Sequence, residues 1–418
     1  MTLVRPELLF LVGGILAVSP YVTWFLFGKN PDYVYSVGGI PAAYWVFGYV
    51  SFFIGSMKWF PSRRGKVEMS LIHSVVKWRT TELLLILCIG LMIQMYFVIS
   101  LYGGIPILLF LTGGLDVESV NQTQLESGFG QIGFLFLTLV MLHGLLLIEI
   151  IRASTSGAPR PIRIFSLIVI IFLIHLFAGK RQGVFIASFF IYCGLSISVG
   201  NPFSAFLRAV GLRVTRARII AFCFTLTIVL IAVFEITGSL RTQNVPERRG
   251  FELFTYVELP LINMEAQSEQ TGFMPKRLDL PAIFSSLLPA KIRDEVNLGT
   301  NLPTLPEPTA PTGFFGPLQW FGGILIAGVF SFGTGIFCKW LFNKSRSSLT
   351  ALLCYSQVSW ALVSAHTYNH FLNLIFIPLP MLSFLILAWL IDGPISGRSA
   401  SHRELARTRK SVESFKGT

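Results

Sequence analysis

Charged side chains are scarce in this sequence of 418 residues. Asp, Glu, Lys and Arg together make up 13% of the chain, whereas apolar residues make up 53%. Soluble domains carry about 25% charged residues, so this chain has too few to cover the outside of a soluble fold of its length. The shortage excludes an ordinary soluble enzyme and indicates a protein whose exterior faces lipid.

Several well-known chemical motifs are also absent. The sequence contains no Walker loop, no dinucleotide-binding fingerprint, no GxSxG, no HExxH and no DxD pair of the kind that metal-dependent sugar transferases use. We therefore expect no cofactor and no metal ion. The net charge is +12. In a membrane protein this excess reflects on which side of the membrane the basic residues lie, so we do not take it as a sign of nucleic-acid binding.

Cysteine is rare as well, and its placement excludes a disulfide framework. No cysteine lies in a polar loop, and the spacing matches no metal-ligand pattern; all five lie in apolar segments, at Cys88, Cys193, Cys223, Cys338 and Cys354. No small-residue cleavage site follows the first apolar stretch, so we expect no removable signal peptide.

Long apolar runs dominate the chain, whose mean hydropathy is +0.67. A membrane-crossing helix needs about 20 mostly apolar residues. We therefore expect an all-α integral membrane fold with about ten transmembrane helices (range ten to twelve). The expected segments are 7–27, 34–57, 82–102, 129–151, 163–179, 182–199, 217–237, 318–340, 350–366 and 371–391.

The distribution of Lys and Arg gives an orientation. If both termini are cytoplasmic, 23 of the 33 basic residues lie in cytoplasmic segments, and only Lys29, Lys180 and Arg181 lie in short loops on the other side. Cytoplasmic loops of membrane proteins carry such an excess. The polar tail 392–418 is basic and fits a cytoplasmic end near anionic lipid.

The expected helices divide the chain into four parts. Helices one to seven occupy 1–237, interrupted by an outside segment at 103–128 that contains a short apolar piece. A large outside loop covers 238–317, helices eight to ten occupy 318–391, and the basic tail is 392–418. Loops of that length are usually functional. We expect 251–267 and 281–289 to form short amphipathic helices lying over the bundle.

Two cations stand in a turn on the outer side, where the positive-inside rule disfavours them. The stretch 175–183, HLFAGKRQG, places Lys180 and Arg181 between two apolar helices. These two side chains could anchor the turn by reaching the membrane interface. Alternatively, they form an anion site between helices, in which Arg181 binds a phosphate through two hydrogen bonds. We expect His175 to be a hydrogen-bonding residue inside the bundle.

Further candidate residues flank the large loop. Arg241 lies where the seventh helix meets this loop, and Arg248 and Arg249 follow; with Arg181 they could bind a diphosphate. Glu235 is an alternative base or an ion partner of Arg241.

Two histidines supply further candidate bases. His366 and His370 lie in the outer turn between the last two helices. Histidine titrates near neutral pH and can accept a hydroxyl proton. The alternative is a pair of interfacial histidines without a catalytic role.

These features together resemble the bacterial O-antigen polymerases of the Wzy type, which join oligosaccharide repeat units. The resemblance rests on the short helices around FAGKRQG, on Gly-Gly-Ile-Pro at 103–106, and on an outer loop that begins near Arg241 and ends at the glycines of 316–323. It covers most of the chain as architecture, and about a tenth of it as specific motifs.

The resemblance implies a GT-C-like fold in the bacterial inner membrane and a metal-independent glycosyltransferase active at the periplasmic face. Donor and acceptor would be oligosaccharides linked to undecaprenyl diphosphate, and a chain-length regulator is a possible partner. Arg181 and Arg241, supported by Lys180, would hold the diphosphate. The alternatives are an O-antigen ligase or another lipid-linked glycan transferase, a lipid-linked sugar transporter or flippase, and a scaffold without catalysis.

Overall fold

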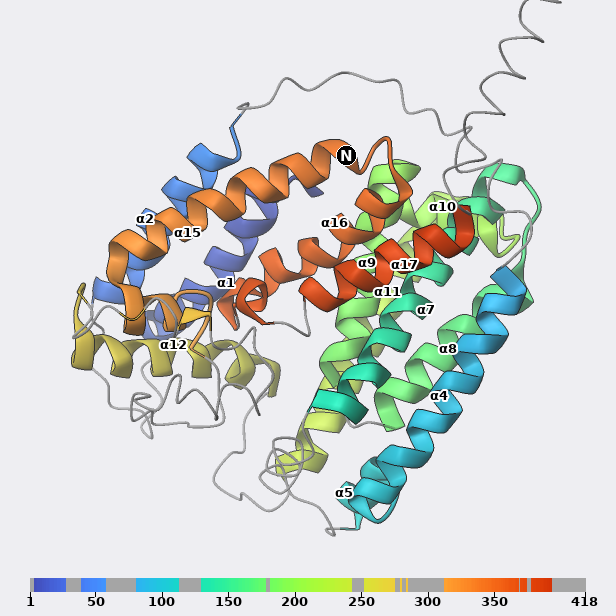
Figure 1. Ribbon diagram of the computed structural model, residues 1–418, viewed down its shortest axis with the longest axis horizontal. Helices are drawn as coiled ribbons and strands as arrows, with labels where there is room; N and C mark the ends of the chain where they lie inside the picture. Colours follow the sequence, from blue (N-terminus) through green and yellow to red (C-terminus); the bar gives the residue numbers. More distant parts are fainter. Residues whose placement is uncertain are drawn as a thin grey trace, which may run out of the picture.

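The computed structural model of the chain describes residues 4–27, 39–57, 80–112, 129–177, 181–242, 252–274, 279, 283–284, 312–367, 369–373 and 377–392. Over these residues the protein is helical, and no β-strand occurs among them. The elements are α1 (Pro6–Phe27), α2 (Gly39–Gly55), α4 (Thr80–Tyr102), α5 (Pro106–Leu111), α7 (Phe129–Ser156), α8 (Pro161–Phe177), α9 (Arg181–Ser198), α10 (Pro202–Ala209), α11 (Arg216–Thr242), α12 (Glu252–Thr271), α15 (Gly316–Lys344), α16 (Leu349–Val363), η3 (Ser364–His366), η4 (His370–Leu372) and α17 (Pro378–Asp392) (Figure 1).

Each of the ten segments expected to cross the membrane contains a helix. Five helices are long and apolar enough to cross by length and composition: the windows are Pro6–Thr23, Leu83–Tyr102, Leu137–Ser156, Arg216–Val233 and Gly316–Lys344. Helices α9 and α10 are bent by 98° at a short break, and they make a sixth candidate membrane span if the two are counted as one broken helix. The apolar helices α2, α8 and α17 are shorter. This architecture is consistent with a multi-pass membrane protein.

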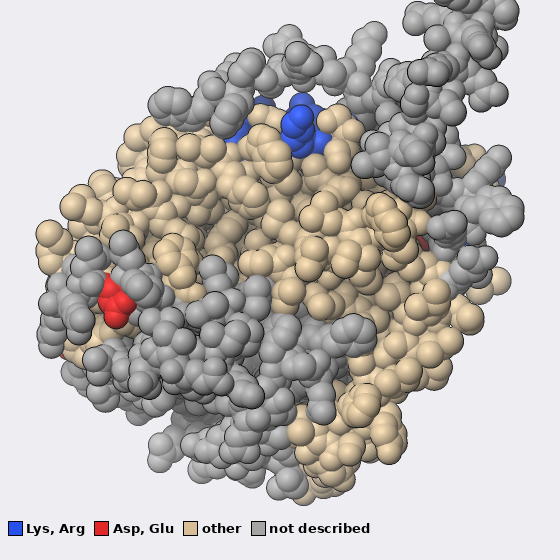
Figure 2. Space-filling view, viewed as in Figure 1, with Lys and Arg blue, Asp and Glu red and all other residues tan. Residues whose placement is uncertain are grey.

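Apolar side chains are exposed on the outside of the bundle, as lipid contact requires. No residue of Arg216–Val233 is buried, and α4 exposes a series of large side chains that includes Leu85, Met92 and Tyr96. Figure 2 shows that the described surface on this face carries few charged side chains. In water such a surface would drive aggregation, so its physical explanation is a lipid exterior.

Small residues allow the closest helix contacts. A Cβ at Gly335 of α15 would clash with the carbonyl oxygen of Phe52, and a Cβ at Gly55 of α2 would clash with that of Phe332. Helices in membranes commonly approach through such small residues, because packing and not the hydrophobic effect holds them together. Glycine at these positions therefore sets the α2–α15 pair.

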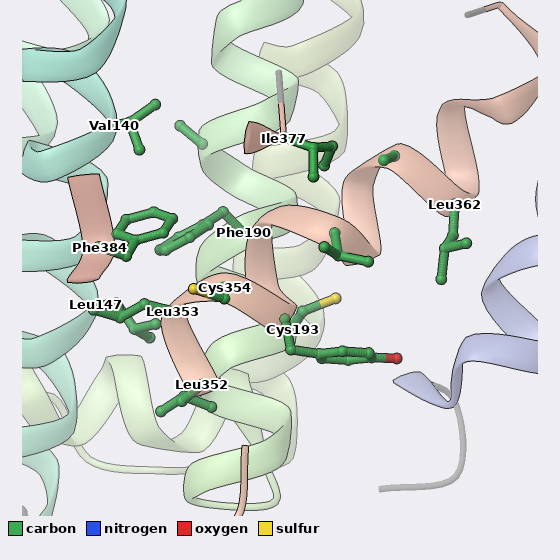
Figure 3. Close-up of a cluster of buried hydrophobic side chains, with 14 of the residues drawn as sticks. Val140, Leu147, Phe190, Cys193, Leu352, Leu353, Cys354, Leu362, Ile377 and Phe384 are labelled. Carbon is green, nitrogen blue, oxygen red and sulfur yellow. The ribbon is translucent and has the colours of Figure 1, made fainter. Parts of the chain in front are cut away.

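A second group of helices packs around α9. Phe190 of α9 stacks on Phe384 of α17 with ring centroids 5.4 Å apart, and both rings are buried. Leu147 of α7 and Leu353 of α16 fill the space beside them (Figure 3). This part of the core is therefore formed by α7, α9, α16 and α17.

The region expected as a large outer loop contains a buried helix. Helix α12 packs against α1, α2, α11 and α15, and it lies below α1, α2 and α15 in the view of Figure 1. Its residues from Glu258 to Ser268 are almost all buried. This confirms the expected helix at 251–267. Most of 281–289 lies outside the described residues. We call the end of the bundle that α12 covers the α12 end, and the opposite end, with the α7–α8 turn, the basic end.

Candidate functional site

The two candidate histidines lie in a buried turn at the α12 end. Helix α16 ends at Val363, and two short 3₁₀ turns follow instead of a continued α-helix. His366 is 9% exposed and His370 is 1% exposed. The Nδ1 atom of His366 lies 3.1 Å from the carbonyl oxygen of Val363. The histidines are therefore part of the interior, and not an exposed interfacial pair.

A neighbouring segment fixes this turn through backbone hydrogen bonds. The N–H of Gly313 donates to the carbonyl of Thr367 at 3.0 Å, and the N–H of Phe314 donates to that of Ala365 at 2.8 Å. The side-chain amide of Asn369 donates to the carbonyl of Phe314 at 2.8 Å. Gly313 has a φ of 72°, a conformation that glycine adopts without strain. The turn is held in one position by these contacts.

Helix α12 adds buried carboxylates beside the turn. It contacts η3, and so does α1. The hydroxyl of Tyr21, on α1, donates to Oε1 of Glu265 at 2.6 Å. Glu265 is 1% exposed and Glu258, two turns earlier on the same helix, is 3% exposed. A buried carboxylate is costly unless it is hydrogen-bonded, so the contact with Tyr21 stabilises this arrangement.

Amide side chains join α12 to the start of α15. The amide of Gln267 donates to the carbonyl of Gly316 at 2.6 Å, and that of Gln319 donates to the hydroxyl of Ser268 at 2.7 Å. All three side chains are buried. Together with the histidine turn and the carboxylates they form what we call the outer polar cluster: Tyr21, Glu258, Glu265, Gln267, Ser268, Gln319, His366, Asn369 and His370.

Burial controls the protonation of the two histidines, which lie in the turn outside the membrane-spanning helices. Burial lowers the pKa of His366 to about 4. Burial, together with the charge of His366, lowers the pKa of His370 to about 3. Both imidazoles are therefore neutral at pH 7, and each has a nitrogen lone pair that can accept a hydrogen bond from a hydroxyl.

The cationic stretch at 175–183 begins in the interior of the bundle. Nε2 of His175 lies 3.4 Å from Nε2 of His143 on α7, which confirms the expected buried role of His175. Gly183 of α9 packs against the His175 ring so closely that a Cβ there would clash with it. These contacts place three residues of different helices at the same height along the bundle: His143, His175 and Gly183. Arg181 lies two residues before Gly183 in α9.

The height of His143 along the bundle is far from the first residue of α7. Helix α7 continues for fourteen residues from His143 back to its start at Phe129, about 21 Å at 1.5 Å per residue. Helix α8 ends two residues after His175, at Phe177. Arg181 therefore begins α9 about 18 Å short of the end of α7. The backbone of Arg181 is described, whereas its side chain is not.

Helix α9, which begins at Arg181, packs against α16, which leads into the histidine turn. A Cβ at Gly194 of α9 would lie 3.0 Å from Oγ of Ser356 on α16. Arg181 and His366 therefore stand at the ends of two neighbouring helices.

The other candidate residues are placed as follows. Lys180, Arg248 and Arg249 lie outside the described residues. Arg241 is in the last turn of α11, and its side chain is not described. Glu235 is half-buried on the same helix. Arg241 lies six positions further along the same helix, so whether Glu235 is its ion partner stays a prediction.

Sequence reasoning missed the carboxylate and amide members of the outer polar cluster. Glu265 and Tyr21 are 244 residues apart in the chain, and no local pattern links them. The available signal was the position of Glu258 and Glu265 within the mostly apolar stretch 251–267. Acidic residues seven apart share one face of a helix, and in this helix that face points into the bundle.

Comparison with known proteins adds no assignment. No family model matches the sequence, no curated protein matches it, and no solved structure matches the fold. Among the described residues, no group of three or more His, Cys, Asp or Glu side chains is placed to hold a metal ion. The site is therefore interpreted from its own geometry.

Proposed function

We propose that the chain is a membrane-embedded glycosyltransferase that polymerises oligosaccharide repeat units carried on undecaprenyl diphosphate. In this proposal all ten apolar helices cross the bacterial inner membrane in a GT-C-like arrangement, both termini are cytoplasmic, and the α12 end faces the periplasm. Two lipid-linked oligosaccharides are the substrates, a chain-length regulator is a possible partner, and neither a cofactor nor a metal ion takes part.

One observation carries the proposal. Helix α9, which begins at Arg181, packs against α16, which leads into the buried histidine turn. A transferase of this kind needs a cation for the leaving diphosphate and a base for the attacking hydroxyl. The packing of these two helices supports such a pairing.

The reaction requires three changes at one centre. An acceptor hydroxyl oxygen attacks the anomeric carbon of the donor sugar. The bond from that carbon to the diphosphate oxygen breaks, and its electron pair stays with the diphosphate. The hydroxyl proton passes to a base. In our proposal Arg181 and Arg241, with Lys180, stabilise the charge on the diphosphate, and neutral His366 or His370 accepts the proton.

The depth of Arg181 favours a functional cation over a surface anchor. An Arg at the centre of a membrane helix costs about 2.5–3.5 kcal/mol on translocon-insertion scales, and the cost falls toward the helix ends. Such residues are usually functional for that reason. An anchor reaches the interface from the end of a helix, whereas Arg181 begins α9 about 18 Å short of the end of α7.

Deletion of the gene tests the reaction class. A polymerase deletion leaves lipid A–core that carries a single repeat unit, visible as the loss of the lipopolysaccharide ladder. A ligase deletion leaves bare core and accumulates lipid-linked polymer. An unchanged ladder, in a strain without a redundant gene, would contradict both transferase assignments and favour transport or a scaffold.

A further inference from the structure

Helix α15 is broken near its start, at the α12 end of the bundle. Gly323 has φ 69° and ψ −175°, a backbone region that is open essentially to glycine alone. The rest of the helix, from Ile324 to Lys344, is about 30 Å long, and the hydrocarbon layer of a bilayer has about the same thickness. With Lys344 at one boundary of that layer, the break at Gly323 lies at the other.

The segment that follows α12 binds into this break through its backbone. The N–H of Ile324 donates to the carbonyl of Phe273 at 3.1 Å, and the N–H of Asp279 donates to the carbonyl of Phe321 at 3.0 Å. The hydroxyl of Tyr44, on α2, also donates to the Phe273 carbonyl, at 3.3 Å. Because a helix end leaves backbone groups without partners inside the helix, these bonds hold the segment at the level of the break. We call the described part of this segment, 272–274, 279 and 283–284, the strap.

The strap has one large side chain that packs inward and three that are exposed. Ile283 is 1% exposed, and a Cβ at Gly322 would lie 3.1 Å from its Cδ1 atom. Phe273, Met274 and Phe284 are exposed by 46%, 63% and 46%. Large apolar side chains that gather on a surface indicate a site of interaction with a membrane or another protein.

The exposed side chains of the strap adjoin the lipid-facing surface of α2 and α15. Leu325 and Val329, which follow the break in α15, are exposed by 62% and 69%, and Val46 of α2 is exposed by 67%. The two residues that bond to the strap, Ile324 and Tyr44, are next to Leu325 and two positions before Val46 in the chain. The apolar exterior of the two helices therefore continues onto the strap.

We propose that the strap is a membrane anchor, in which Phe273, Met274 and Phe284 insert into the lipid leaflet at the α12 end. Surface-bound segments bury apolar side chains about 5–10 Å into the boundary between headgroups and acyl chains. Glu269 is exposed on the last turn of α12, just before the strap, and it stays among the headgroups. The insertion is therefore shallow.

Bilayer lipid, and not a second copy of the chain, is the partner of this surface. The exterior that the strap continues belongs to α15, whose length after the break matches the bilayer, and the break places the strap at the membrane boundary. The anchor connects α12, which packs against η3 beside His366, to the membrane surface. This inference does not depend on the proposed reaction.

Spin labels measure the depth of the strap directly. Met274→Cys is labelled in the full chain, in which Cys88→Ala and Cys223→Ala remove the two cysteines that are not buried. The protein is placed in vesicles of phosphatidylethanolamine and phosphatidylglycerol. Collisions of the label are then measured with oxygen, which concentrates among acyl chains, and with a water-soluble nickel chelate present on both sides of the vesicles.

Two reference labels bracket the expected result. Val329→Cys lies on the exposed face of α15 and reports the acyl region, whereas Ser347→Cys lies in the exposed turn after α15 and reports water. We expect the ratio of oxygen collisions to nickel collisions at Met274→Cys to be close to that of Val329→Cys and well above that of Ser347→Cys.

Two other results would each overturn the proposal. A ratio equal to that of Ser347→Cys would place the strap in water. Low collision rates with both reagents would show that protein covers the strap, either another part of the chain or a second copy. Neither result bears on glycan polymerisation, so the anchor and the proposed reaction can fail separately.

Discussion

Gly194 of α9 packs directly against Ser356 of α16, and this contact is one of those that set the register between the two helices. A Cβ at Gly194 would lie 3.0 Å from Oγ of Ser356 and would clash with the buried side chain of Leu147. The same two helices meet again where Phe189 and Trp360 form a ring contact at 6.0 Å. This packing makes α9, which begins at Arg181, a neighbour of α16, which leads into the turn of His366.

A large side chain at Gly194 should therefore disturb both stability and activity. We expect Gly194→Leu to lower the free energy of unfolding by about 1–3 kcal/mol, because it overpacks a core without space. Thermal unfolding in detergent measures the loss. Gly333→Leu is the matched control, since Gly333 is an exposed helical glycine with nothing within 4 Å of its Cβ position. Equal effects of the two substitutions would contradict the packing argument.

The histidine turn should make stability depend on pH in a defined direction. The folded pKa values of His366 and His370, about 4 and about 3, lie below the ordinary value of about 6.5. The unfolded chain therefore takes up protons first as the pH falls. Stability is fully present above pH 6.5 and declines toward pH 4, by about 1.4 kcal/mol per pH unit for each histidine.

Unfolding temperatures measured between pH 7.5 and pH 4 test this expectation. The variant that combines His366→Gln and His370→Gln separates the histidines from the nearby carboxylates Glu258 and Glu265, which remain in it. We expect its unfolding temperature to vary less with pH above pH 5 than that of the wild type. An identical slope in both proteins would show that the histidines are not the titrating groups.

The hydrogen bond between Tyr21 and Glu265 should be important for the attachment of α12. Tyr21→Phe leaves one oxygen of a buried carboxylate without its 2.6 Å hydroxyl donor, which costs about 1–3 kcal/mol. Limited proteolysis within 238–317, together with thermal unfolding, measures the effect. Tyr96→Phe is the control, because Tyr96 is 69% exposed on α4. Unchanged cleavage and stability in Tyr21→Phe would show that this bond does not hold the helix.

The apolar segments and several local elements were predictable from the sequence, because hydropathy is a local property. All ten expected segments contain helices, and the stretch 251–267 forms α12 as expected. The helix ends were less predictable. Helix α16 stops at Val363 and not at 366, since the backbone of the turn bonds to Gly313 and Phe314, far away in the sequence.

The contacts between helices could not be predicted in the same way. His175 was expected to be an interior hydrogen-bonding residue, but its partner His143 lies on another helix. Arg181 lies short of the end of α7 because α7 and α8 differ in length. The relative position of these two helices is known only from a contact between them, such as that of His175 with His143. The sequence of a helix that is apolar on nearly all sides gives little information about which neighbouring helix each of its faces contacts.

The most direct test of the central claim is polymer formation by single variants in a deletion strain. The strain is complemented at matched membrane levels with wild type, with Arg181→Ala, with the variant that combines His366→Ala and His370→Ala, or with Arg216→Ala, an exposed arginine at the basic end. The surface polysaccharide is then separated on a gel. We predict a full ladder for wild type and Arg216→Ala, and a single repeat unit for Arg181→Ala and for the double histidine variant. A full ladder from either of the latter two would contradict the account.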